Sequence, residues 1–219
     1  MPDRPSPNFG KRADDVPIDM LVLHYTGMKD AELALDRLCD PTAEVSAHYC
    51  VDEDGTIFTL VDEKHRAWHA GVSYWRGETD INSRSIGVEI VNPGHEFGYR
   101  PFPEAQMAAL IPLCQQILSR HPIPARNVVG HSDTAPDRKQ DPGELFDWCR
   151  LASEGIGLWP EPANPGDQSL DSLLAAFGYN MRAGGYIAAF QRHFRPKAIT
   201  GGQDAESLRI AAGLIDLIS

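Results

Sequence analysis

Residues 19–24, DMLVLH, form a short apolar run that ends in a histidine, and residues 126–131, RNVVGH, repeat this pattern. Each run has the length and composition of a buried strand, so the sequence predicts strands that leave a sheet at His24 and at His131. Functional side chains of α/β proteins usually lie where strands run out into loops. The two histidines are therefore the first candidate functional residues.

The segments between these runs carry local signals of their own. They are a hairpin pattern over 46–61 around Glu53-Asp54-Gly55, a strand pattern over 85–91 and helical spacing over 31–39. A further helix is expected to open at Pro103, and Pro112 should kink it or end its first half. The polar stretch 66–84 is expected to be a surface loop. Strands that alternate with helices predict an α/β fold with a mixed central β-sheet flanked by helices.

The charge of the chain is uneven. Among 219 residues, Lys and Arg number 20 and Asp and Glu 31, which gives 20 − 31 = −11. Residues up to Asn164 hold 26 acids and 15 bases, and residues from Pro165 onward hold 5 of each, so the whole net charge lies in the first part. A negative field repels a phosphate backbone, and nucleic acid is not expected as a partner.

Composition also suggests how the chain is divided. Four prolines in the first 17 residues indicate a flexible lead-in, and three prolines in WPEPANPG, 159–166, indicate a linker. Helical spacing recurs over 169–177, 183–194 and 205–218, which predicts a small C-terminal three-helix bundle. The expected units are a lead-in (1–17), a main domain (18–158), a linker (159–167) and a helical domain (168–219).

The cysteines and the apolar runs indicate the cellular compartment of the protein. No apolar stretch approaches the roughly 20 residues of a membrane span, and the first residues lack a signal-peptide pattern. The cysteines are widely spaced among apolar neighbours, at Cys39, Cys50, Cys114 and Cys149. This favours buried free thiols in a reducing compartment, with two disulfides as the alternative. We expect a cytoplasmic monomer, or a periplasmic protein if a signal has been removed.

Asp141 follows His131 by ten residues in a polar loop. Two imidazoles and one carboxylate leave one open position on a tetrahedral zinc ion, as in catalytic sites, although a strand-end histidine is often structural. Glu89 lies in an apolar strand, where a carboxylate is costly to bury unless it is paired or faces a cavity; otherwise it faces solvent. Lys139 supplies a positive charge beside such a metal, or is a surface lysine.

Five motifs occur in a familiar order. They are LVLHYTG (21–27), VSAHY (45–49), AWHAG (67–71), SIGVEIV (85–91) and VGHSDTAPDRKQDPG (129–143). Together they resemble the zinc-dependent N-acetylmuramoyl-L-alanine amidases of the AmpD and AmiD type, amidase family 2, from about residue 19 to about residue 153. The resemblance implies the mixed-sheet fold that this family shares with peptidoglycan-recognition proteins.

The resemblance also implies roles for single residues. One zinc ion would be held by His24, His131 and Asp141, with Glu89 and Lys139 as the catalytic pair. The residues expected to contact substrate are Tyr25, His48, Trp68, His69 and Trp75. Aromatic packing under a long loop is the alternative for the last three.

The implied reaction is hydrolysis of the amide between the lactyl group of ordinary or 1,6-anhydro N-acetylmuramic acid and L-alanine. The expected partner is thus peptidoglycan or a muropeptide, in cell-wall turnover or recycling. Two alternatives stay open: a non-catalytic peptidoglycan-binding protein, and a zinc amidase of other specificity.

A second resemblance concerns the C-terminal helices. LLAAFGY (173–179) and YIAAFQRHF (186–194) are similar to the three-helix peptidoglycan-binding domain of cell-wall hydrolases. The intervening MRAGGY, 181–186, departs from the usual pattern of that domain. The alternative is a purely structural bundle that packs on the amidase domain.

Overall fold

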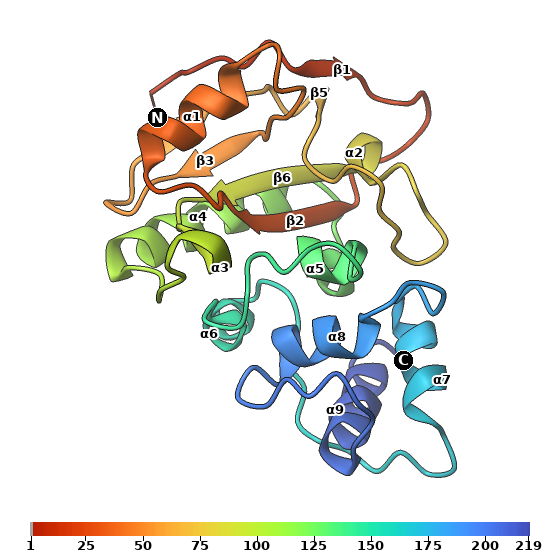
Figure 1. Ribbon diagram of the computed structural model, residues 1–219. Coiled ribbons are helices and arrows are strands. Elements are labelled where there is room, and N and C mark those ends of the chain that lie inside the picture. Colours follow the sequence, from red (N-terminus) through yellow and green to blue (C-terminus); the bar gives the residue numbers. More distant parts are fainter. Residues whose placement is uncertain (1) are drawn as a thin grey trace.

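The computed structural model describes residues 2–219, and its centre is a five-stranded sheet in the order β4-β3-β6-β2-β7 (Figure 1). The strands of this sheet are β2 (Met20–Tyr25), β3 (Tyr49–Val51), β4 (Ile57–Thr59), β6 (Ser85–Ile90) and β7 (Val128–Gly130). Neighbouring pairs among β3, β6, β2 and β7 are parallel, whereas β4 is antiparallel to β3. The expected mixed sheet is confirmed.

Helices flank this sheet. They are α1 (Ala31–Cys39), α2 (Ile81–Arg84), α3 (Gly94–Phe97), α4 (Glu104–Arg120), α5 (His131–Thr134), α6 (Trp148–Ser153), α7 (Leu170–Phe177), α8 (Tyr186–Phe194) and α9 (Ala205–Asp216). The helices expected over 31–39 and in the C-terminal segment are confirmed, as is the hairpin of β3 and β4. No helix within residues 2–219 is long and apolar enough to cross a membrane.

β2 is buried because different layers cover its two faces. Leu21 and Leu23 belong to the hydrophobic cluster that includes α4. Met20 and Val22 belong to the cluster formed with the C-terminal helices. Because alternate residues of a strand point to opposite faces, His24 lies on the same face as Met20 and Val22. That face is the one on which the C-terminal helices pack.

Pro112 does not end the helix in which it lies. α4 runs from Glu104 to Arg120 with Pro112 inside it. The expected end is wrong because the residues that follow, among them Leu113, Cys114 and Ile117, are buried against the sheet. Burial of several apolar side chains at about 1.5–3 kcal/mol each exceeds the roughly 3 kcal/mol cost of an interior proline.

The stretch 66–84 is not a surface loop. It begins within β5 (His65–Ala67) and ends with α2, and between them Trp75 is 1% exposed. Trp75 packs edge-on against Phe177 and Tyr179. These partners lie a hundred residues away, so the local polar pattern of the stretch does not reveal them.

The first residues are ordered, so the expectation of a flexible lead-in is wrong. β1 (Phe9–Lys11) pairs antiparallel with β5, and Ser6 and Asn8 are buried. The guanidinium of Arg12 donates to the backbone carbonyl oxygens of four residues, Glu63, Asn82, Ser83 and Ser85. The lead-in is therefore held at the edge of the main domain by the pairing of β1 with β5 and by the half-buried cation of Arg12.

Arg12→Ala is expected to lower the free energy of unfolding by about 2–4 kcal/mol. A hydrogen bond from a charged donor contributes about 1.5–3 kcal/mol, and the substitution removes the donor that four backbone carbonyl oxygens share. Urea denaturation measures the change. Lys11→Ala is the matched control, since its ion pair with Asp14 is almost fully exposed, and it should change stability by less than about 0.5 kcal/mol. Equal stability of the two variants would contradict the role of Arg12.

The C-terminal helices form one hydrophobic cluster with the sheet. This cluster joins Leu173, Phe190 and Leu214 of the bundle to Met20 and Val129 of the sheet. Figure 1 shows the bundle on the side of α5 and α6, away from α1. Residues 159–166 contain no helix or strand, yet Trp159 packs against the clusters of both regions.

The cysteine expectation is only partly correct. All four cysteines lie in the described residues and none is in a disulfide. Cys50 and Cys114 are buried, Cys39 is half-buried and Cys149 is exposed. Cys149 lies in the first turn of the short helix α6, whose buried side chains are Trp148 and Leu151, so its position on the helix turns it to solvent.

Candidate metal and hydrolase site

Three neighbouring parallel strands bring the candidate residues together. His24 and Glu89 are paired residues of β2 and β6, so their side chains lie on the same face of the sheet. On the other side of β2, Leu23 is paired with Gly130 of β7, and His131 follows at once. The carboxyl ends of these strands therefore place Glu89, His24 and His131 in a row.

Three acceptor atoms converge at this row. His24 Nδ1 lies 3.0 Å from both His131 Nδ1 and Asp141 Oδ2, and His131 Nδ1 lies 3.2 Å from Asp141 Oδ2. All three side chains are buried. Burial, and secondarily the nearby His131, lower the pKa of His24 to about 4, so its imidazole is neutral at physiological pH.

A chain of hydrogen bonds fixes the proton of His24. The Ser85 hydroxyl donates to the carbonyl oxygen of Ile81 (2.7 Å), so its oxygen must accept from His69 Nε2 (3.1 Å). His69 Nδ1 then carries a lone pair and accepts from His24 Nε2, 3.0 Å away. The proton of His24 is thus on Nε2, and its Nδ1 presents a lone pair.

The same reasoning applies to His131. Its Nε2 lies 3.0 Å from the carbonyl oxygen of Ala70, which can only accept, so Nε2 carries the proton and Nδ1 the lone pair. With Asp141 ionised, three lone pairs face one another with no hydrogen between them. Such acceptors repel unless a cation lies among them, and two imidazole nitrogens with a carboxylate are a typical zinc donor set. These residues fit a metal ion.

Glu89 is the carboxylate next to this cluster. Its Oε2 is buried and has no hydrogen-bond partner within residues 2–219. Burial, together with the negative charge of Asp141, raises the pKa of Glu89 well above its ordinary value, while Lys139 lowers it. The carboxylate is therefore held in a state that favours proton uptake, and the alternative, that Glu89 lies on the solvent face, is wrong.

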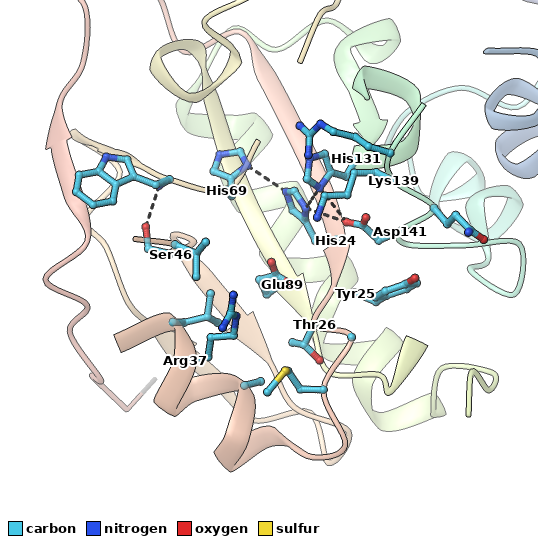
Figure 2. Close-up of a pocket in the computed structure, with 18 residues that line it drawn as sticks. His24, Tyr25, Thr26, Arg37, Ser46, His69, Glu89, His131, Lys139 and Asp141 are labelled. Atoms are coloured by element: carbon cyan, nitrogen blue, oxygen red, sulfur yellow. Dashed lines mark hydrogen bonds and ion pairs between the residues drawn. The ribbon is translucent and has the colours of Figure 1, made fainter. Parts of the chain in front are cut away.

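The cluster opens into a cavity of about 350 Å³. Besides the residues above, its lining includes Tyr25, Trp68, His69 and Lys139. Figure 2 shows that Glu89 on β6 and Lys139 on the loop after α5 approach the cavity from different elements. Of the residues expected to contact substrate, Tyr25, Trp68 and His69 thus border the cavity.

His48 and Trp75 lie elsewhere, and their assignment as substrate-contacting residues is wrong for this structure. His48 is fully buried, where its Nδ1 accepts from the backbone N–H of Gly87. Trp75 is buried under the C-terminal helices, and its indole N–H donates to Asn127 Oδ1. Both are packing residues because the backbone around them turns their rings into the protein.

Two arginines that the sequence patterns did not single out border the cavity. Arg37 comes from α1, and Arg138 precedes Lys139. The Arg138 guanidinium donates to the carbonyl oxygens of Ala70 and Val72. No local signal in the sequence shows that α1 forms one wall of the cavity.

Comparison with known proteins agrees with this geometry. The family described as N-acetylmuramoyl-L-alanine amidase, Amidase_2, matches residues 14–144, which include all five residues of the predicted metal and catalytic set. The chain belongs to this family. It is therefore an N-acetylmuramoyl-L-alanine amidase, a hydrolase.

Two amidase structures resemble the chain over nearly its whole length. N-acetylmuramoyl-L-alanine amidase AmiD of Escherichia coli K12 is 41% identical over 231 residues, covering 91% of this chain and 83% of AmiD. A structure of E. coli AmiD in complex with anhydro-N-acetylmuramic acid-L-Ala-D-γ-Glu-L-Lys aligns with a TM-score of 0.83 at 40% identity, covering 94% of this chain and 93% of that one. AmpDh3 of Pseudomonas aeruginosa aligns with a TM-score of 0.84 at 33% identity, covering 94% and 95%. This amidase thus shares the architecture of both, C-terminal region included.

Proposed function

We propose that this amidase is zinc-dependent, with one Zn²⁺ held by His24, His131 and Asp141. It cleaves the amide between the lactyl group of ordinary or anhydro-N-acetylmuramic acid and L-alanine in a muropeptide. The observation that supports this most is the convergence of three buried lone pairs within 3.0–3.2 Å, each fixed by hydrogen bonds or ionisation. A non-catalytic binding protein has no use for such a donor set.

Glu89 is the proposed general base and acid. A zinc ion held by His24, His131 and Asp141 would supply Lewis-acid chemistry, polarising the scissile carbonyl and lowering the pKa of the attacking water to about 7. Glu89 accepts a proton from the attacking water, and its raised pKa lets it hold that proton until the amide nitrogen departs. It then donates the proton to that nitrogen, which leaves as the free amino group of L-alanine.

Lys139 is proposed to stabilise negative charge on the carbonyl oxygen. It lies two residues from Asp141 and lines the same cavity as Glu89. Positive charge held in a partly desolvated cavity lowers the energy of an oxyanion more than it does in water. Because the net charge of the chain is −11, substrate carboxylates are recognised through such local cations and not through the overall field.

The proposal is tested on a defined substrate, anhydro-N-acetylmuramic acid-L-Ala-D-γ-Glu-L-Lys. We expect mass spectrometry to find a free tripeptide with an alanine N-terminus, and we expect a chelator to abolish its release and added zinc to restore it. Hydrolysis that is indifferent to chelator would exclude the zinc mechanism. An intact substrate with stoichiometric zinc bound would instead favour another amide as the substrate.

His69→Phe is expected to weaken zinc binding by about 10–100-fold, the usual effect of removing a hydrogen-bond partner from a metal-ligating histidine. A phenyl ring keeps the contact with Gly87, where an added Cβ would lie 2.4 Å from the His69 ring, but it cannot accept from His24 Nε2. Competition with a fluorescent chelator measures the affinity. Trp68→Phe is the neighbouring control, and equal affinity in the two variants would contradict this role of His69.

Further proposals concern the C-terminal helices, the compartment and the assembly. The resemblance of residues 168–219 to peptidoglycan-binding domains supports binding of polymeric peptidoglycan. Co-sedimentation with insoluble sacculi tests this binding.

Four cysteines outside disulfides support a reducing, cytoplasmic compartment, and cell fractionation tests this location. A monomer is proposed, and light scattering of the purified chain tests it.

A further inference from the structure

Asp133 is a buried carboxylate between the metal cluster and the C-terminal bundle. It is 1% exposed and lies two residues after His131 in the four-residue helix α5. Its Oδ1 accepts from the Tyr179 hydroxyl at 2.7 Å, and its Oδ2 accepts from His193 Nδ1 at 2.7 Å and from the backbone N–H of Gly130 at 2.8 Å. Two of its three donors therefore come from beyond the linker.

A second contact reaches the same turn. The His193 ring stacks on Trp148, with ring centroids 3.8 Å apart. Trp148 in turn packs on Gly130, where an added Cβ would lie 3.4 Å from the indole. Figure 1 shows α8, which carries His193, beside α5 and α6. The bundle thus holds the turn that leads into His131 both through a carboxylate and through an aromatic stack.

We propose that the C-terminal bundle positions the metal ligand His131, with Tyr179 and His193 acting as positioning residues through Asp133. A helix of four residues has little stability of its own, so the orientation of α5 depends on what fixes its side chains. The backbone N–H of Ser132 also donates to the carbonyl oxygen of Asp141 at 2.9 Å. Holding α5 therefore holds two of the three metal ligands.

The burial of Asp133 distinguishes this arrangement from a tethered module. Domains that associate loosely meet through polar, hydrated surfaces. A carboxylate sealed between the two regions is tolerated only when donors from both sides satisfy it, and separation would leave it with Gly130 alone. The bundle thus supports the active site from outside its cavity, whether or not it also binds peptidoglycan.

The inference rests on the proposed zinc site, and metal affinity tests it apart from activity. In the full chain, Tyr179→Phe removes one donor to Asp133, and His193→Phe removes the other while it keeps the stack on Trp148. We expect each variant to raise the zinc dissociation constant about tenfold, which is in the range measured when residues that orient metal ligands are replaced. We also expect each variant to alter the visible absorption spectrum of the Co²⁺-substituted protein. The measurements are made well below the melting temperature of each variant.

Tyr186→Phe is the matched control. Its hydroxyl donates to Asp171 Oδ1 at 2.9 Å, so this variant also loses a Tyr–Asp hydrogen bond in the bundle, but one whose acceptor lies in α7 and not in α5. It should bind zinc as the wild type does. Unchanged affinity and Co²⁺ spectra in both Tyr179→Phe and His193→Phe would overturn the inference, as would an equal loss in Tyr186→Phe. If the wild type binds no zinc, the proposed function fails first.

Discussion

Glu89→Gln is expected to lower kcat on the soluble muropeptide by about 10²–10⁴-fold, the usual contribution of a general acid–base group. The carboxamide has nearly the same shape as the carboxylate but cannot accept the proton of the attacking water. Zinc content should stay at one ion per chain, because Glu89 is not one of the three converging donors. Steady-state kinetics and elemental analysis of the same sample measure both quantities.

The stability of the same variant gives an independent check of the environment of Glu89. Because its Oε2 finds no donor among the described residues, a neutral amide removes a desolvation cost. The melting temperature of metal-free Glu89→Gln should therefore equal or exceed that of the wild type, as is common where a catalytic group is held at a cost to stability. Glu78→Gln, which changes an exposed carboxylate paired with Arg84, is the control and should alter neither rate nor metal content. Near-normal turnover by Glu89→Gln would disprove the assignment.

The candidate site was predictable because its residues lie at the ends of strands with clear local patterns. His24 and His131 each end an apolar run, and parallel pairing brings such ends to one edge of a sheet. Spacing and strand context singled out Asp141, Glu89 and Lys139, the family motifs implied their roles, and the structure places all five residues at one cavity. What local patterns could not supply is the chain from Ser85 through His69 that fixes the proton of His24, since it depends on tertiary contacts.

The two segments wrongly predicted to lack order, 1–17 and 66–84, share one physical cause. The lead-in and the stretch 66–84 are polar and rich in proline or glycine, and their order comes from partners remote in sequence. Arg12 finds its carbonyls 51 or more residues away, and Trp75 finds its aromatic partners in the C-terminal segment. Composition reports how a segment behaves alone, whereas these segments are ordered by long-range contacts. For the same reason Trp75, a conspicuous aromatic near the motifs, proved to be a packing residue.

His131→Ala is expected to remove zinc and, with it, activity by about a thousandfold or more, because the water then loses the large pKa reduction that the metal provides. The two remaining donors, His24 and Asp141, fall short of the three protein ligands of a catalytic zinc site. Equilibrium dialysis and kinetics on the same muropeptide measure the two losses. His121→Ala is the matched control, since His121 pairs with Glu63 outside the cavity, and it should keep both metal and activity.

Thermal stability separates loss of the metal from loss of the fold in His131→Ala. A ligand that binds only the folded state stabilises it by about 2.7 kcal/mol at 100 times its dissociation constant, so the wild type should melt at a higher temperature when zinc is added. The variant should show no such shift. Its metal-free form should melt close to the metal-free wild type, because the substitution removes one of three mutually repelling lone pairs and so offsets part of the lost packing. A zinc-dependent shift that persists in His131→Ala would place the metal elsewhere.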